Sequence, residues 1–316
     1  MGNPPGRLQW PLQLPGRIMG IFPTFCPAPH LFGARPTPIP GSGFQIAGHS
    51  LRPRGSPMKR APAKGPSRHP APPSGMLVAA DNPATWRDPA QAGIADLGNF
   101  ALALGDIPGS MTLIEQQALA CSHLIALGGD HTIALPLLRA LSKRVGGKLA
   151  LVHFDAHVDT WPDNFGQAIA HGSVFYHAIT EGLVDPGRMV QIGIRSPVSR
   201  DIYEWGIAQG ITVISAEDVH LSNPAAVADR IRAVIGSHPA YLSFDIDALD
   251  PAFAPGTGTP EVGGLASWQA MGILKRLDGL DWRGMDVVEV LPAHDVAEIT
   301  ALAAATVAWN YLSIVT

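Results

Sequence analysis

The stretch LALVHFDAHVDTW, residues 149–161, joins a continuous apolar run to three polar side chains at every second position, Asp155, His157 and Asp159. Such an apolar run is typical of a strand that is buried on both faces of a sheet. Two carboxylates and an imidazole at the edge of a core cost free energy unless another group pairs with them. We therefore expect a partner, and a cation above all, to lie against these three side chains.

The remainder of the chain after residue 85 alternates between short apolar, β-branched runs and stretches with a helical period, which predict strands and helices respectively. The expected strands are 123–127, 148–154, 188–194, 211–215, 240–246 and 286–291, and the expected helices are 132–145, 172–183, 198–209, 224–236, 267–277 and 296–313. This alternation predicts an α/β fold, a three-layer α/β/α sandwich with a mainly parallel sheet. In such sheets, ligands bind beyond the carboxyl ends of the strands.

Polar residues occur where these expected strands end. His131 follows the first strand closely, Asp245 and Asp247 follow the apolar run AYLSF, and Glu289 lies inside the last run. A carboxylate within a buried strand requires a partner, so Glu289 indicates a nearby cation. Taken singly, each residue also has an ordinary explanation, as a helix N-cap or as a satisfied core side chain. Glu261, in the glycine-rich loop 256–265, is expected to have a rim or structural role.

The combination of these residues favours a metal site. Four aspartates at one sheet edge would repel one another by about 4 kcal/mol per contact at an intermediate dielectric constant. Two divalent cations would neutralise the four carboxylates, and two histidines would complete the ligand set. A mixed Asp/His set without thiolates suits Mn²⁺ or a similar ion better than structural zinc. The expected ligands are His131, Asp155, His157, Asp159, Asp245 and Asp247.

Five motifs together resemble the ureohydrolase (arginase/agmatinase) family, and its agmatinase branch most closely. They are GGDHTIALPLLRAL, HFDAHVDTW, AHGS, SFDIDALDPAFAPGTGTPEVGGL and VVEVLPAHDVAEITALAAAT. The resemblance covers about residues 90–316. It implies the arginase-like α/β/α fold and a manganese-dependent hydrolysis of a guanidino compound to urea and an amine.

The resemblance also implies roles for individual residues. One metal ion would be held by His131, Asp155, Asp159 and Asp245, and a second by His157, Asp155, Asp245 and Asp247, so that Asp155 and Asp245 bridge the pair. His171 in AHGS matches the family's proton-shuttling histidine, and Glu289 matches the acid that holds the guanidinium group. Asp247 or His171 would return a proton to the leaving amine.

The residue after the DxHxDT motif bears on the substrate. Arginase-like members carry polar residues here that hold an amino-acid head group, whereas this chain has the largely apolar Trp161. This favours agmatine, which would give putrescine and urea in polyamine biosynthesis, and 4-guanidinobutyrate is the alternative. Ordinary packing of Trp161 is the competing explanation.

The N-terminal part has a different composition. Residues 1–75 hold 17 of the 30 prolines and none of the 26 acidic residues. This proline density disfavours helices and central strands, and the stretch 52–73 is predicted to be a disordered basic tail. We interpret residues 1–85 as an atypical segment, disordered or translated out of frame, and residues 86–316 as the catalytic domain. A catalytically impaired relative is therefore a further alternative function.

Charge and hydropathy limit the partners. The net charge of −4 provides no field that would attract nucleic acid. The C-terminal run 299–316 is about long enough to cross a bilayer, but it is rich in alanine, contains Asn310 and lacks a basic flank, so it predicts a buried helix instead. We expect a cytoplasmic enzyme with a small cationic guanidino substrate, without nucleic-acid or membrane partners. The resemblance implies a homo-oligomer, a trimer or hexamer.

Overall fold

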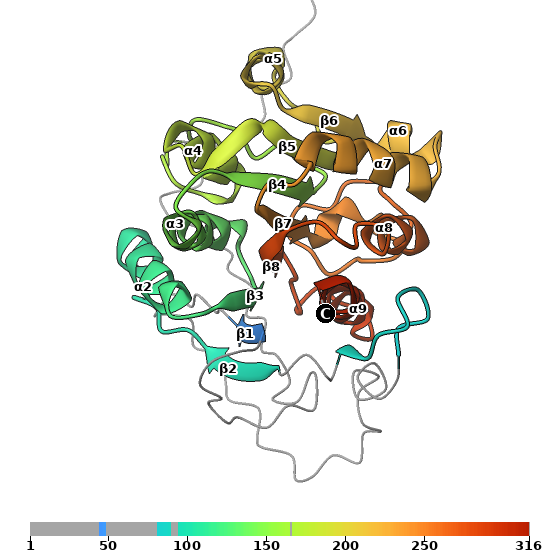
Figure 1. Ribbon diagram of the computed structural model, residues 1–316. Coiled ribbons are helices and arrows are strands. Elements are labelled where there is room, and N and C mark those ends of the chain that lie inside the picture. The colour runs from blue at the N-terminus through green and yellow to red at the C-terminus, as the bar shows by residue number, and fades with distance from the viewer. Residues whose placement is uncertain (1–43, 49–80, 90–93, 165, 316) are drawn as a thin grey trace, which may run out of the picture.

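The computed structural model describes residues 44–48, 81–89, 94–164 and 166–315 (Figure 1). The predicted basic tail at 52–73 lies outside these residues. The described strands form one sheet in the order β2-β1-β3-β8-β7-β4-β5-β6, and every neighbouring pair is parallel. The strands are β1 (Phe44–Gly48), β2 (Ala95–Asn99), β3 (His123–Leu127), β4 (Leu149–Phe154), β5 (Val184–Ile194), β6 (Thr212–Ser215), β7 (Ala240–Asp245) and β8 (Trp282–Val288).

Helices cover both faces of this sheet. Figure 1 shows α2, α3 and α4 on one face and α7, α8 and α9 on the other, with α5 at the end next to β6. The predicted three-layer α/β/α sandwich is thereby confirmed, and each of the six predicted strands and six predicted helices has a counterpart. The last predicted strand, 286–291, is shifted: β8 ends at Val288, so Glu289 lies after the strand and not within it. The helices are α2 (Ile107–Leu119), α3 (Ala134–Val145), α4 (Val174–Thr180), α5 (Arg200–Gln209), α6 (Ala216–His220), α7 (Pro224–Ile235), α8 (Ser267–Leu274) and α9 (Ile299–Val315), and the 3₁₀ turns are η2 (His131–Ile133), η3 (His171–Ser173) and η4 (Ile246–Ala248).

The alternation of side chains along each strand builds two apolar cores. In β3, Leu124 and Ala126 join the cluster under α2, α3 and α4, whereas Ile125 and Leu127 join the cluster under α7, α8 and α9. Successive strand side chains point to opposite faces, so a strand buried on both faces must be apolar throughout. This requirement explains why the sequence of the central strands shows continuous apolar runs rather than an alternating pattern.

Strand β1 differs from the expectation for the N-terminal part. No strand was expected within residues 1–75, yet β1 pairs with both β2 and β3 inside the sheet. Its five residues, FQIAG, contain no proline, and the high proline content of the surrounding segment masked this local signal. Helices α2 and α6 and strand β2 were also not predicted. The domain boundary at residue 85 stays a prediction.

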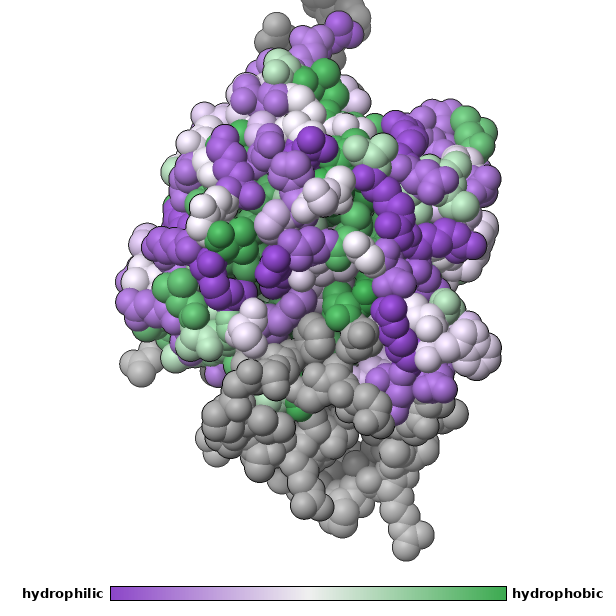
Figure 2. Space-filling view, in the orientation of Figure 1, coloured by the Kyte–Doolittle hydropathy of each residue, from purple (hydrophilic) through white to green (hydrophobic). Residues whose placement is uncertain are grey.

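Helix α9 forms from the run that was weighed as a membrane segment. It packs against β8 and buries most of its 17 residues, and Asn82 donates hydrogen bonds to Asn310 Oδ1 (3.0 Å) and Ser313 Oγ (2.9 Å). The prediction of a buried helix is confirmed. Among the described residues, no helix combines the length and apolarity needed to span a bilayer, and hydrophilic side chains predominate on the face seen in Figure 2. The cytoplasmic location stays a prediction.

Gly193 in β5 provides a test of how closely the strand packs beside Asp155. Its φ is +99°, and an added Cβ would lie 2.9 Å from the backbone oxygen of Asp155. We expect Gly193→Ala to lower the free energy of unfolding by about 1–3 kcal/mol, because it combines backbone strain with a steric clash. Gly147, where an added Cβ meets nothing within 4 Å, is the matched control, and Gly147→Ala should change stability by less than about 0.5 kcal/mol. Urea denaturation of both variants measures this difference, and equal stabilities would contradict the prediction.

Candidate metal centre

The carboxyl ends of four adjacent strands, β3, β8, β7 and β4, bring the predicted residues together. Turn η2 places His131 after β3, and Asp155 directly follows β4. Asp245 ends β7 and its neighbour Asp247 lies in η4, while Glu289 directly follows β8. All six expected ligands therefore meet at one edge of the sheet, and all are buried except the partly buried His157.

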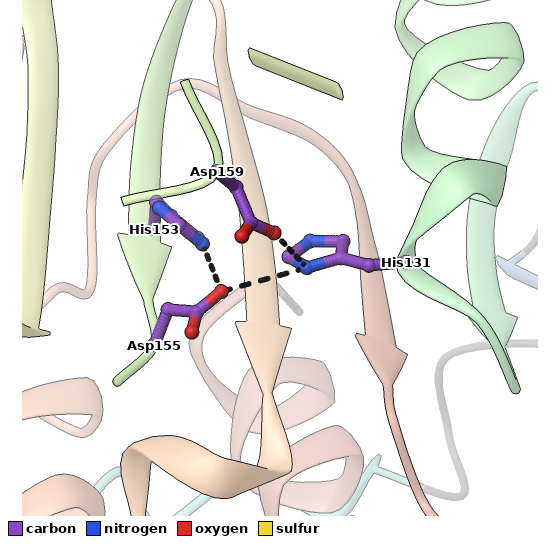
Figure 3. A group of neighbouring side chains, drawn as sticks. All are labelled: His131, His153, Asp155 and Asp159. Atoms are coloured by element: carbon purple, nitrogen blue, oxygen red, sulfur yellow. Dashed lines mark hydrogen bonds and ion pairs between the residues drawn. The ribbon is translucent and has the colours of Figure 1, made fainter. Parts of the chain in front are cut away.

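Three carboxylates surround one ring nitrogen of His131. Its Nδ1 atom lies 2.9 Å from Asp159 Oδ2, 3.3 Å from Asp245 Oδ2 and 3.5 Å from Asp155 Oδ2. Figure 3 shows the ring of His131 directed toward Asp155 and Asp159. This fully buried Nδ1 makes no hydrogen bond of acceptable geometry within the described part of the chain. A buried nitrogen that faces three acidic oxygens without a hydrogen bond fits the ligand shell of a cation.

A second cluster shares Asp155 with the first. His157 Nδ1 lies 3.2 Å from both Asp155 Oδ1 and Asp247 Oδ2. Asp155 thus directs one oxygen toward His131 and the other toward His157, as a bridging ligand would. Asp245 instead accepts the backbone N–H of Asp247 at Oδ1 (2.9 Å), so its role as a second bridge stays a prediction.

The pKa shifts indicate a site that requires positive charge. Burial and the charges of Asp247 and Asp155 raise the pKa of Asp245 well above its usual value, and burial and Asp155 also raise that of Asp247. Burial opposes the protonation of His157, but its hydrogen bonds with Asp155 and Asp247 raise its pKa to about 12. Protons are therefore attracted to the place where the acids converge, and divalent cations would satisfy the same charge demand.

Two site residues have a left-handed backbone that non-glycine residues rarely adopt. Asp159 has a φ of 50° and Glu289 a φ of 60°. Each such residue costs about 1–3 kcal/mol and persists only where its surroundings hold it. The N–H of Phe175 donates to the carbonyl of Asp159 (3.0 Å), and the N–H of Glu289 donates to the carbonyl of Gly129 (2.8 Å). With the backbone in this conformation, both carboxylates lie at the site.

A cavity of about 180 Å³ lies next to the clustered acids and is lined by Asp159 and Asp245. Its walls include the predicted residues His171, Glu289 and Trp161. Burial and the charge of Asp130 raise the pKa of Glu289 well above its usual value, and no Lys or Arg forms an ion pair with it in the described residues. The full set of lining residues is His131, His157, Asp159, Trp161, Asn164, His171, Gly172, Asp245, Thr259 and Glu289.

The structure adds site residues that sequence reasoning missed. Thr259 donates to Asp247 Oδ2 (3.3 Å), and Asn164 Nδ2 lies 3.3 Å from His171 Nε2. Figure 3 shows the side chain of His153 in contact with Asp155, and the distance from His153 Nε2 to Asp155 Oδ2 is 2.7 Å, although the sequence indicated only a strand residue there. The available signals were the glycine-rich loop around Thr259 and the position of His153 two residues before Asp155.

Arg195 joins the glycine-rich loop to the turn that carries Asp247. Its guanidinium group donates to the carbonyl oxygens of Glu261 (2.6 Å), Asp247 (2.8 Å) and Gly193 (3.1 Å). The carboxylate of Glu261 accepts from Ser196 Oγ (3.2 Å) and is not part of the cavity wall. These contacts agree with the structural role that was expected for Glu261.

Comparisons with known proteins show which proteins this chain is similar to. The sequence model of the arginase family matches residues 66–313. The agmatinases of Photorhabdus laumondii and Escherichia coli (strain SE11) are each 46% identical to this chain, over 223 residues (69% of both chains) and 225 residues (70% of both chains). A hypothetical agmatinase from Burkholderia thailandensis superposes with a TM-score of 0.74 at 38% identity, covering 87% of this chain and 86% of its own. The proclavaminate amidino hydrolase from Streptomyces clavuligerus superposes with a TM-score of 0.74 at 31% identity, covering 92% and 96%.

The repulsion at Asp245 predicts opposite effects of one substitution in the metal-free and metal-loaded protein. The raised pKa of Asp245 in the folded state means that the metal-free wild type loses stability as the pH rises through that pKa. Asp245→Asn removes this loss, so the metal-free variant should be more stable than wild type by about 1–3 kcal/mol near pH 8, with a smaller difference near pH 5. Mn²⁺ at about 1,000 times its dissociation constant should stabilise wild type by about 4 kcal/mol and the variant far less.

Thermal unfolding with and without Mn²⁺ measures both effects. The partly exposed residue Asp281, which pairs with Arg283 away from the site, provides a charge-matched control, because Asp281→Asn should leave the gain from Mn²⁺ unchanged. Equal stabilisation of the Asp245→Asn variant and wild type by Mn²⁺ would contradict a ligand role for Asp245.

Proposed function

The chain belongs to the arginase family, and on that premise we propose that it is a binuclear manganese enzyme that hydrolyses agmatine to putrescine and urea. The observation that carries this proposal is the placement of a partly buried acid, Glu289, which has no Lys or Arg partner in the described part of the chain, in the same small cavity as His131, Asp159 and Asp245. That arrangement fits a cationic substrate whose reacting carbon must lie close to activated water.

The metal centre would use the two clusters that share Asp155. We assign His131, Asp155, Asp159 and Asp245 to one ion and His157, Asp155, Asp245 and Asp247 to the other. A pair of divalent cations would lower the pKa of a water molecule and so supply a nucleophile at neutral pH. The absence of thiolates from this set supports manganese rather than zinc.

Glu289 would hold the guanidinium group of the substrate. Its Oε1 atom accepts the backbone N–H of His131 (2.7 Å), which fixes the carboxylate at the cavity wall. Gly258 approaches the other oxygen, and a Cβ at this glycine would lie 3.7 Å from Oε2. Charge-assisted hydrogen bonds from a planar guanidinium group to this carboxylate would orient its carbon for attack.

Proton transfer would use Asp247 and His171. Asp247 Oδ2 faces His157 and accepts from Thr259, and burial and the charge of Asp155 raise the pKa of this carboxyl, which suits it to take a proton from the attacking water. His171 lies in η3 at the exposed part of the cavity wall, where Asn164 Nδ2 lies 3.3 Å from its Nε2. Either group can return a proton to the leaving amine, which collapses the tetrahedral intermediate.

The choice of agmatine rests on the agmatinases among the relatives and on the apolar wall formed by Trp161. A substrate with an amino-acid head would require polar partners in that position. Trp161 lies next to the HGS turn, where its backbone N–H donates to the carbonyl of Gly172 (3.1 Å). Assembly as a trimer or hexamer stays a prediction.

The test is urea release by the Mn²⁺-loaded full chain, with agmatine, 4-guanidinobutyrate and arginine offered in parallel. We expect turnover of agmatine above the other two. Glu289→Gln keeps the shape of the side chain but removes its charge, and should lower kcat/KM for agmatine by about 10²- to 10³-fold. Glu204→Gln on the exposed face of α5 is the matched control and should retain wild-type kinetics.

The other outcomes distinguish the alternatives. Turnover of 4-guanidinobutyrate alone would replace the substrate and keep the mechanism. No urea from any of the three substrates, with two Mn²⁺ ions bound per chain, would indicate the catalytically impaired relative and would reject the proposed activity.

A further inference from the structure

We propose that Asp286 is a positioning residue that acts through Ser243 to fix which ring nitrogen of His131 carries hydrogen, and so keeps the other nitrogen available to a metal ion. This inference rests on the proposed metal centre and concerns residues outside its expected ligand set. Asp286 lies in β8 and Ser243 in β7, and the two residues are register partners in the sheet.

The side chains of His131, Ser243 and Asp286 form a buried chain of hydrogen bonds. His131 Nε2 lies 2.8 Å from Ser243 Oγ, and the hydroxyl of Ser243 donates to Asp286 Oδ1 (2.7 Å). The hydroxyl of Tyr241 donates to Asp286 Oδ2 (2.8 Å). His131, Ser243 and Asp286 are fully buried, so these polar atoms depend on one another for partners.

The single hydroxyl hydrogen of Ser243 determines which atom donates and which accepts in each hydrogen bond of this chain. A serine hydroxyl has one hydrogen, and Ser243 directs it to Asp286. Its oxygen can therefore only accept from His131, which requires the ring hydrogen to be on Nε2. Nδ1 is then the nitrogen whose lone pair is left for a metal ion, and it is the atom that faces Asp155, Asp159 and Asp245. Such outer hydrogen bonds are known to fix the tautomer of metal-binding histidines.

The neighbouring His153 also carries its ring hydrogen on Nε2, but its Nδ1 has a protein donor as its partner. Gln191 Nε2 lies 2.6 Å from the carbonyl of Val158, so this amide atom is the nitrogen, and it also donates to His153 Nδ1 (3.2 Å). The hydrogen of the His153 ring is therefore on Nε2, which donates to Asp155 Oδ2 (2.7 Å). Two buried histidines in one cluster thus differ in function: His153 orients a carboxylate, whereas His131 offers a free nitrogen. The difference lies at Nδ1, which receives the amide of Gln191 in His153 and faces three carboxylates in His131.

The decisive variant is Asp286→Asn, which keeps the size of the side chain and reverses one hydrogen bond. The amide oxygen can accept from Tyr241 while the amide nitrogen donates to Ser243, which then turns its hydroxyl toward His131 Nε2. The ring hydrogen moves to Nδ1, where it blocks metal binding. We expect the Mn²⁺ affinity of the site that contains His131 to fall about 10- to 100-fold, with the affinity of the His157 site within about twofold of wild type.

Tyr241→Phe is the matched control. Tyr241 lies on the same strand as Ser243, and its hydroxyl also donates to Asp286. Removing that hydroxyl leaves the hydrogen bond from His131 to Ser243 in its original direction. Both Mn²⁺ affinities should stay within about twofold of wild type. Ser243→Ala serves as a second variant if Asp286→Asn does not fold, because it removes the constraint on His131 and should weaken the same site selectively.

Calorimetric titration of metal-free protein with Mn²⁺ gives the two affinities, and anomalous diffraction at a limiting Mn²⁺ concentration identifies the weakened site. Equal losses at both sites in Asp286→Asn and Ser243→Ala, or losses no larger than in Tyr241→Phe, would overturn the positioning role. If wild-type protein binds no Mn²⁺ pair, the proposed metal centre fails and this inference with it. If wild type binds two ions and Asp286→Asn binds them equally well, only this inference fails.

Discussion

The repulsion among carboxylates at the end of a buried sheet is the constraint on which the rest of the site depends. Side chains as close as those of Asp155, Asp245 and Asp247 would separate if their backbones were free to move. The parallel ladder of β4, β7 and β8 prevents this. Asp155 directly follows β4 and Asp245 ends β7, both strands are held on both sides, and Asp247 lies in the turn η4 that follows β7. Backbone donors add to the restraint, since the N–H groups of His157 and Ala156 bind Asp155 (2.6 Å) and Asp247 (3.1 Å).

Hydrogen bonds outside the acidic cluster determine how its members are oriented. Arg195 ties the carbonyl groups of the Asp247 turn to the glycine-rich loop, and Ser243 connects His131 to the neighbouring strand. These contacts join segments that are far apart in the sequence but adjacent in the sheet. The site is therefore a product of strand order: β3, β8, β7 and β4 must lie side by side before any of its side chains can meet.

The sequence predicted the parts of this molecule that leave a local signal. Continuous apolar runs identified six strands, and acids and histidines at their ends identified the expected ligands. Strand β1 was missed because its five residues lie in a segment rich in proline. Asp286 was missed for another reason: it appeared as one polar residue in an apolar run, and only the register that pairs it with Ser243 gives it a partner. Asn164 gave no signal, because its position near His171 depends on the path of a loop.

The walls of the cavity come from two kinds of segment, residues that follow strands of the sheet and residues of a long connecting segment. His131 lies in the turn η2 after β3 and Glu289 directly follows β8, and a hydrogen bond of 2.7 Å joins the residues expected to hold metal and guanidinium. Trp161 and Asn164 belong instead to the segment between β4 and η3. Substitutions in that segment can reshape the space for the substrate tail while the reacting end keeps its geometry. An enzyme built this way can exchange one guanidino compound for another through changes in a single segment of the chain.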